Sequence, residues 1–258
     1  MRRRIILLVL LLFPIISWGQ SRLVKDKLAR ANEVKANSGI CAEYIDALFL
    51  ASDEAFKENE MTIALEVQKE LVLSIKQVYP DNEDMIHSSE DMLATLYLMS
   101  GLYLEALPLQ IKAYQRDKGI NVEADLDALE LLSHSTYKLK RYQESIEYRK
   151  EKIALIEKYQ GKTILYAENI YILALLFLET KDFDNALVYT QASVCLFQEL
   201  NEINSDLYLR AIQTLRELDP ESQINDGDEI HKQYLACLDS YFKTDDVKYI
   251  QQALNEFV

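Results

Sequence analysis

The chain has 258 residues, of which 49% are hydrophobic, and its formal net charge is −14. With only 6 glycines and 4 prolines, it has little material for long loops, a barrel or a glycine-rich phosphate cradle, and an all-helical protein fits best. A surface this acidic repels phosphate backbones and anionic lipid head groups, which argues against a nucleic-acid partner.

Residues 1–19 have the pattern of a secretory signal peptide. Residues 2–4 are arginines, residues 5–16 are almost wholly apolar, and Ser17 and Gly19 place small residues three and one positions before a cut ahead of Gln20. The apolar run is short for a membrane span, although an uncleaved tethering helix is the alternative. We therefore expect export to the periplasm or the exterior, with no stable membrane span after cleavage. The mature net charge would be about −17.

The three cysteines do not form a disulfide framework. Cys41, Cys195 and Cys237 are an odd, sparse set, and the latter two stand among apolar neighbours, which favours small buried core residues. A bridge between Cys195 and Cys237 is the alternative. No cysteine or histidine spacing matches a metal site.

The polar, lysine-rich residues 20–39 predict a linker or a frayed helix. From residue 40 the apolar periodicity becomes helical and is broken at regular intervals. It predicts four helix pairs at about 40–80, 83–118, 122–160 and 163–201. Residues 164–178 are apolar almost all round, which indicates a helix buried inside the array. Residues 202–258 predict a degenerate repeat and a C-terminal helical cap, with helices at about 205–218, 229–243 and 246–257. Pro108 stands early in its helix, either in the first turn or at a kink.

One seven-residue sequence motif recurs in all four helix pairs. Residues 101–107 read Gly-Leu-Tyr-Leu-Glu-Ala-Leu, and copies begin at residues 59, 140 and 181. Each has a turn-tolerant or polar residue, a large residue two places later, a small residue three places further on and then an aliphatic one. The large residues are Met61, Tyr103, Tyr142 and Phe183, spaced by 42, 39 and 41 residues. Small residues allow two helices to approach closely, and large ones fill the space beside them. The positions expected to pack the repeats are Ala64, Tyr97, Gly101, Tyr103, Ala106, Tyr142, Ser145, Phe177, Phe183 and Ala186.

This arrangement resembles the tetratricopeptide-repeat (TPR) family over about residues 40–201. The unit is 39–42 residues long, where the family's usual unit has 34, as in the longer repeats that resemble kinesin light-chain modules. The resemblance implies an all-α, right-handed α-solenoid of stacked antiparallel helix pairs. The signal and the repeats together are similar to exported bacterial proteins of this type.

In the family, the first helix of each pair lines a concave face that binds a protein or peptide partner. The positions implied here are Phe49, Asp53, Phe56, Asp91, Thr95, Leu98, Met99, Glu130, His134, Tyr137, Lys138, Tyr171, Leu175 and Leu178. An apolar and aromatic strip with scattered polar groups suits an extended peptide or a partner helix. The alternative is that half of these side chains are core.

No motif for catalysis, a metal or a cofactor stands in the sequence. It contains no HExxH, no phosphate-binding loop and no serine elbow, so we expect a non-enzymatic interaction scaffold without cofactors. The alternatives are a sensor or regulatory TPR module of an envelope signalling system, or a fragment of a longer chain. A glycan-binding protein, suggested by the 16 tyrosines, and an enzyme are weaker alternatives.

Overall fold

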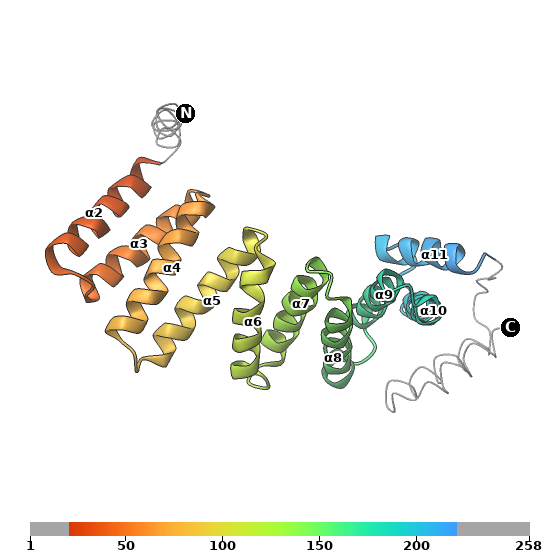
Figure 1. The fold of residues 1–258 in the computed structure, drawn as a ribbon. Helices are drawn as coiled ribbons and strands as arrows, with labels where there is room; N and C mark the ends of the chain where they lie inside the picture. The colour runs from red at the N-terminus through yellow and green to blue at the C-terminus, as the bar shows by residue number, and fades with distance from the viewer. Residues whose placement is uncertain (1–20, 221–258) are drawn as a thin grey trace, which may run out of the picture. The chain divides into compact units, whose positions relative to one another are not determined.

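The computed structural model describes residues 21–220, which are mostly helical and contain no β-strand (Figure 1). The helices in this range are α2 (Arg22–Ser38), α3 (Ala42–Lys57), α4 (Met61–Val78), α5 (Glu83–Met99), α6 (Tyr103–Asp117), α7 (Val122–Lys138), α8 (Tyr142–Gln160), α9 (Ile164–Glu179), α10 (Phe183–Glu199) and α11 (Asp206–Leu218). The chain divides into two compact units, unit 1 ending at Ala113 and unit 2 beginning at Tyr114. The expected signal peptide, the helices expected at 229–243 and 246–257, and Cys237 lie outside the described residues.

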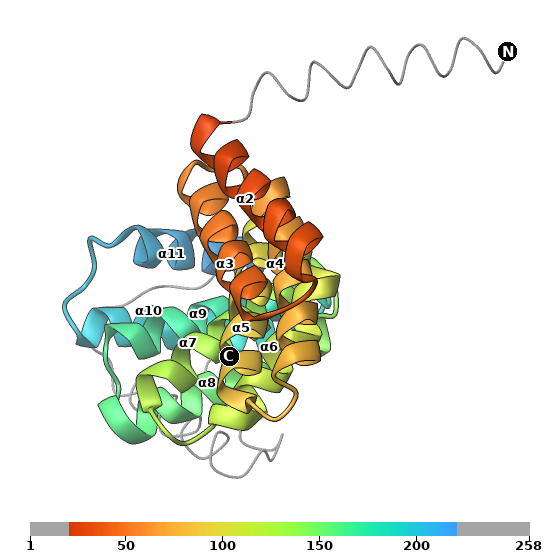
Figure 2. The ribbon, with the colours of Figure 1, turned by 90° about the vertical axis from the view of Figure 1, so that its left-hand side faces the viewer.

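The helices follow one another in pairs joined by three-residue turns: α3 with α4, α5 with α6, α7 with α8, and α9 with α10. Helices that are joined by so short a turn and pack on each other run antiparallel. Figures 1 and 2 show the α3–α4 hairpin from two sides. The all-α solenoid architecture of stacked helix pairs that the sequence predicts is therefore confirmed.

Every one of these turns uses the same backbone conformation. Its middle residue has a positive φ, between 59° and 71°, at Asn59, Gly101, Lys140 and Lys181. At the first turn, the N–H of Asn59 donates to the carbonyl of Phe56 at 3.0 Å and the N–H of Glu60 donates to that of Ala55 at 2.8 Å. This pair of bonds is the Schellman motif, which satisfies the last carbonyls of a helix. The motif recurs at all four turns although only one has glycine.

The unequal repeat spacing resides mainly in the second helix of each pair. The first helices, α3, α5, α7 and α9, have 16 or 17 residues. The second helices vary more, with 18 residues in α4, 15 in α6, 19 in α8 and 17 in α10. Pro108 is the sixth residue of α6 and removes the donor for the carbonyl of Leu104. Because Leu104 is 68% exposed, water can solvate that carbonyl.

Residues 22–38 are a regular helix, where the sequence favours a linker or a frayed helix. Ser21 caps α2 by accepting a hydrogen bond from the N–H of Leu23. Val24, Ala31 and Val34 are at most 3% exposed, and the latter two share a cluster with side chains of α3. The apolar side chains are few and widely spaced, so the sequence signal is weak, but their burial against α3 orders the segment.

The small residues of the repeat lie where the sequence places them. Ala64, Ala106, Ser145 and Ala186 are all fully buried. Of the large residues, Phe177 is buried, and Tyr97, Tyr103 and Tyr142 are half-buried. Phe183 differs, since it is 58% exposed. It is the first residue of α10, and no described helix covers it, so its expected packing role is wrong.

Helix α9 is the centre of the core of unit 2. Its side chains are buried on almost every side, and it packs against α8, α10 and α11. Phe177 stacks on Tyr189 of α10 with ring centroids 5.2 Å apart. Among the described helices, none is both long and apolar enough to cross a membrane. Cys195 has a free thiol and is 2% exposed, and this burial raises its pKa.

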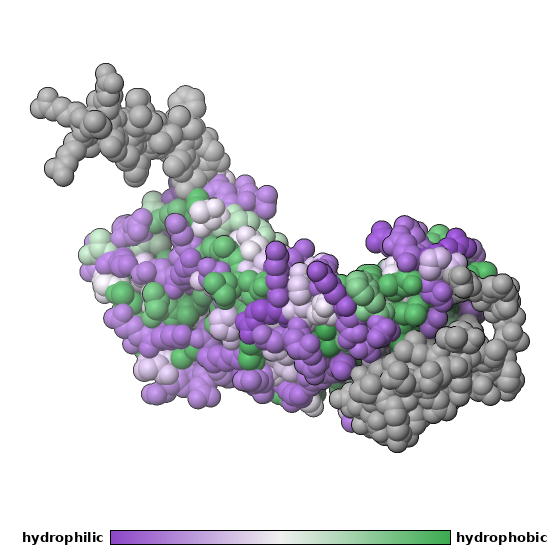
Figure 3. Space-filling view, turned by 45° about the vertical axis from the view of Figure 1, so that its right-hand side comes forward, coloured by the Kyte–Doolittle hydropathy of each residue, from purple (hydrophilic) through white to green (hydrophobic). Residues whose placement is uncertain are grey.

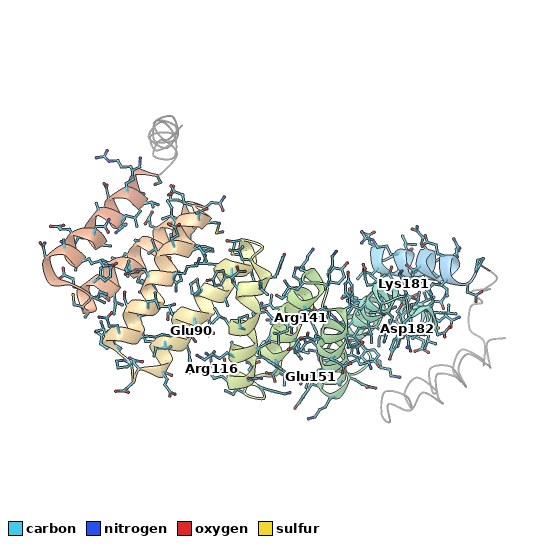
Figure 4. The ribbon with its side chains drawn as sticks, viewed as in Figure 1. Glu90, Arg116, Arg141, Glu151, Lys181 and Asp182 are labelled. Atoms are coloured by element: carbon cyan, nitrogen blue, oxygen red, sulfur yellow. The ribbon has the colours of Figure 1, made fainter. Side chains whose placement is uncertain are left out.

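A buried carboxylate ties three helices of unit 1 together. Glu90 of α5 (labelled in Figure 4) is 6% exposed. Its oxygens lie 2.7 Å from Lys76 Nζ of α4 and 2.6 Å from Lys112 Nζ of α6. Burial would raise the pKa of this carboxyl, but the two ammonium groups outweigh it and lower the pKa.

Candidate functional site

In each unit, a groove lies between consecutive first helices. The first groove, in unit 1, lies over α4 between α3 and α5 and has a volume of about 530 Å³. Its lining residues are Ile45, Asp46, Phe49, Ser52, Asp53, Phe56, Gln68, Leu71, Ile75, Asn82, Asp84, Met85, Ser88, Ser89, Met92 and Leu96. The second groove, in unit 2, lies over α8 between α7 and α9 and has a volume of about 410 Å³. Its lining residues are Glu130, Ser133, His134, Tyr137, Ser145, Arg149, Ile172, Leu175, Leu176, Leu178 and Glu179.

The walls of the first groove carry apolar side chains that are exposed to solvent. Phe49 and Phe56 on α3 are 60% and 36% exposed, and Met85 and Met92 on α5 are 37% and 44% exposed. The residues of each wall recur three, four and seven apart, so they form a stripe along one face of the helix. Figure 3 shows groups of hydrophobic side chains among hydrophilic ones on one face of the described residues.

The floor of the first groove is polar but internally satisfied. Ser52 Oγ donates to Gln68 Oε1 at 2.8 Å, and Gln68 Nε2 donates to the carbonyl of Ser89 at 2.9 Å. Ser89 Oγ donates in turn to the carbonyl of Ile86 at 2.8 Å. This chain of bonds links α3, α4 and α5, so it fixes the positions of the two walls.

The second groove contains a buried cation at the position equivalent to Gln68. Arg149, like Gln68, stands seven residues after the residue that opens its helix. It is 3% exposed, forms a bidentate pair with Glu130 of α7, and donates to Asn169 Oδ1 of α9 at 2.7 Å. Lys152 Nζ also lies 2.7 Å from Glu130.

This cluster sets the charge of the second groove. Burial would raise the pKa of the Glu130 carboxyl, but its bonds to Arg149 and Lys152 outweigh that effect and lower the pKa to about 2. Burial and the nearby Lys138 charge lower the pKa of His134. The carboxylate of Glu130 is therefore compensated before any ligand arrives.

The structure places eight of the expected binding residues on the groove walls. They are Phe49, Asp53 and Phe56 in the first groove, and Glu130, His134, Tyr137, Leu175 and Leu178 in the second. The positions share a register, because Phe49, Asp53 and Phe56 on α3 are equivalent to Glu130, His134 and Tyr137 on α7. Lys138 is outside the second groove, with its Nζ 6.0 Å from the ring centroid of Tyr137.

The expected residues of α5 do not line the first groove. Asp91, Thr95 and Leu98 are equivalent to Phe49, Asp53 and Phe56, and with Met99 they lie off its wall. The second helix of each groove contributes positions one residue along, about 100° around the helix: Met92 and Leu96 on α5, Ile172 and Leu176 on α9. On α9 these positions are added to Leu175 and Leu178, whereas α5 contributes no residue from the register of Phe49, Asp53 and Phe56. The apolar stripe of Met85, Met92 and Leu96 was the available sequence signal.

Tyr171 is a core residue, and its expected place on the groove wall is wrong. It is 3% exposed and belongs to the core of unit 2. Its hydroxyl lies 3.0 Å from Thr214 Oγ1 of α11. Helix α11 therefore contacts the position that would otherwise face a groove.

The lining of the two grooves shows which chemical groups a ligand would meet. No three His, Cys, Asp or Glu side chains within residues 21–220 are placed to hold a metal ion. The two grooves offer apolar side chains, carboxylates, hydroxyls, the His134 imidazole and a guanidinium that is already paired.

Comparison with protein-family models and with curated proteins found no match. Among solved structures, the chain is similar to BtubC (BKLC) from P. vanneervenii, with 16% identity over 91% of each chain and a TM-score of 0.49. It is also similar to the Rap conjugation gene regulator of the plasmid pLS20, solved in complex with the Phr* peptide. There the identity is 12% over 86% of this chain and 64% of the regulator, and the TM-score is 0.41. Neither likeness identifies a partner for this chain.

Proposed function

We propose that the chain is a non-enzymatic helical-repeat protein that binds a peptide or protein segment in the grooves between its first helices. The observation that carries this proposal is the recurrence of a groove at equivalent positions of two repeats. Helix pairs that only pack against one another have no need to keep large apolar side chains in water on facing walls, and exposed apolar grooves commonly bind partners.

A selection from a displayed random peptide library tests this function. Residues 20–258 are immobilised and the retained peptides are measured against two groove variants, Phe49→Asp and Leu175→Asp. The control is Leu73→Asp, because Leu73 is 64% exposed on α4 and lines neither groove. We expect retained peptides to lose at least tenfold in affinity on one groove variant and to bind the control unchanged. Retained peptides that bind both groove variants as tightly as the parent would refute the proposal.

We also propose that the protein is exported by its N-terminal signal and works in the periplasm or outside the cell. The support is the basic and apolar sequence of residues 1–16 and the small residues before Gln20. Expression of the full chain in a bacterial host, followed by intact mass measurement of the envelope fraction, should give a chain that begins at Gln20. Full-length protein confined to the cytoplasm would contradict export.

A further inference from the structure

The first groove differs from the second in its charge. Three of its lining residues, Asp46, Asp53 and Asp84, are acidic, and none is Lys, Arg or His. Within residues 21–220, no ion pair is formed by Asp46 or Asp84. Asp53 lies 2.5 Å from Lys57 Nζ, but both side chains are well exposed, so solvent screens this pair. The apolar walls thus carry net negative charge, from Asp46 and Asp84 in particular.

The floor of the first groove has little to offer to a ligand backbone. An extended peptide needs partners for its own N–H and carbonyl groups when it is taken out of water. The polar side chains of the floor, Ser52, Gln68 and Ser89, are already bonded to one another and to backbone carbonyls. A helical peptide brings its backbone bonds with it and needs only apolar contacts.

The dimensions suit a short helix. The lining residues of α3 run from Ile45 to Phe56, which is about 16 Å along a helix axis. A ligand helix of about eleven residues covers this length. The exposed phenylalanines and methionines form a deformable apolar surface, because methionine side chains adapt to different shapes.

We propose that the first groove binds a basic amphipathic helix, with bulky aliphatic or aromatic side chains on one face and Lys or Arg beside them. The apolar face of the ligand packs between Phe49 and Phe56 on α3 and Met85 and Met92 on α5. Its cations lie against Asp46 and Asp84. This inference rests on the proposed function, which it narrows to one groove and one ligand chemistry.

The test is fluorescence anisotropy on residues 20–258 with labelled peptides of about twelve residues, long enough to span the groove. The probe is made of leucine and lysine, with leucines three and four residues apart. One comparison peptide alternates the same residues with a period of two, and another replaces lysine by glutamate. We expect the helical lysine peptide to bind at least tenfold more tightly than either comparison peptide.

Variants assign the binding to the groove. Phe49→Ala with Phe56→Ala should weaken binding at least tenfold, and Asp46→Asn with Asp84→Asn should weaken it threefold to tenfold and reduce its salt dependence. The matched controls are Leu73→Ala and Asp127→Asn, which change an exposed apolar and an exposed acidic residue outside the groove. Unchanged circular dichroism of each variant separates lost binding from lost folding.

Several outcomes would overturn the inference. Equal binding of the glutamate peptide removes the charge argument, and tighter binding of the alternating peptide assigns the groove to an extended ligand. Binding to residues 20–258 but not to residues 1–258 assigns the groove to the chain's own N-terminal segment. Binding lost in Leu175→Asp but kept in the Phe49 and Phe56 variant moves it to the second groove. That last result would leave the proposed function standing, whereas peptides insensitive to both grooves would remove both proposals.

Discussion

Arg149 on α8 forms a bidentate ion pair with Glu130 on α7, in which Nη2 lies 2.9 Å from Oε1. The arginine side chain is 3% exposed, whereas that of the glutamate is 42% exposed. Because the guanidinium is out of water, it depends on this carboxylate for its compensating charge. The floor of the second groove is therefore held by a contact that can be weakened from the solvent side.

Replacing Glu130 with glutamine should lower the free energy of unfolding by about 2–3 kcal/mol at pH 7. A buried charge that loses its partner costs more than this, but solvent at the carboxylate reduces the effect. Urea unfolding followed by circular dichroism measures the change. Asp127→Asn, one turn earlier on the exposed side of α7, is the control and should change stability by less than about 0.5 kcal/mol. Equal losses in the two variants would contradict the role of the pair.

The same pair predicts an acid dependence. The pKa of Glu130 is lowered to about 2 in the folded protein, against about 4.3 in an unfolded chain. A lowered pKa contributes stability that is complete above the unfolded value and is lost as the pH falls toward the folded value. The difference in stability between the parent and Glu130→Gln should therefore shrink between about pH 4.5 and pH 2. A difference that stays constant over that range would refute this account.

Glycine at the helix-pair turns should stabilise the protein. Lys140 and Lys181 (the latter labelled in Figure 4) have φ values of 59° and 61°, which a side chain makes unfavourable. We expect Lys140→Gly and Lys181→Gly each to raise the free energy of unfolding by about 0.5–1 kcal/mol. Gly101→Ala should lower it by about 1 kcal/mol, although an added Cβ would meet nothing within 4 Å.

The control for the turn variants is Lys138→Gly, which changes the last residue of α7. Glycine gains no advantage from helical backbone geometry, and a lysine charge is favourable at the C-terminal end of a helix, so this variant should be less stable by about 0.3–1 kcal/mol. Chemical unfolding of all four variants gives the comparison. Stabilisation by Lys138→Gly would show that loss of a positive charge, rather than the backbone conformation, is responsible.

A bulky residue at the small position of the repeat should cause overpacking. Ala106 is fully buried, and Ala106→Leu should lower the free energy of unfolding by about 1–3 kcal/mol. Ala154→Leu, on the exposed side of α8, should change it by less than about 0.5 kcal/mol. Thermal unfolding of the two variants tests this, and an unaffected Ala106→Leu protein would mean that the helices do not approach closely there.

Substitutions of Tyr171 should change the stability of the protein and leave its affinity for peptides unchanged. Tyr171→Ala removes a buried ring and should cost about 3–4 kcal/mol, whereas Tyr171→Phe removes only the hydroxyl contact with Thr214 and should cost about 1 kcal/mol. Peptides selected on the parent should bind Tyr171→Phe unchanged. Lost affinity in a stably folded Tyr171→Phe protein would return this residue to a groove.

The four helix pairs could be predicted from the sequence, because a small residue recurs at the same position of each pair. The small residues at Ala64, Ala106, Ser145 and Ala186 predict close helix approach, and all are buried. Helix α2 could not be predicted with the same certainty from the sequence. Its buried residues Val24, Ala31 and Val34 are too widely spaced to indicate a regular helix, and α2 is ordered by packing against α3. The groove wall on α5 could not be predicted by aligning the repeats. Aligned positions of two repeats lie on the same face of their helices, but one groove is lined by helices of two repeats, and α5 lines it with a different face from α3.

The length of each second helix determines the direction in which the chain leaves it toward the next helix pair. Helices α4 and α8 are three and four residues longer than α6, so their last residues are rotated by about 300° and about 400° relative to its end. Relative to one full turn, the chain leaves α4 about 60° before and α8 about 40° beyond the direction in which it leaves α6. Helix α10 is two residues longer than α6, a rotation of about 200°, so the chain leaves it in a direction roughly opposite to that of α6. It then needs six residues, 200–205, to reach α11, where the earlier links use three or four. Insertions of a whole turn into a second helix should thus preserve the array, and insertions of half a turn should interrupt it.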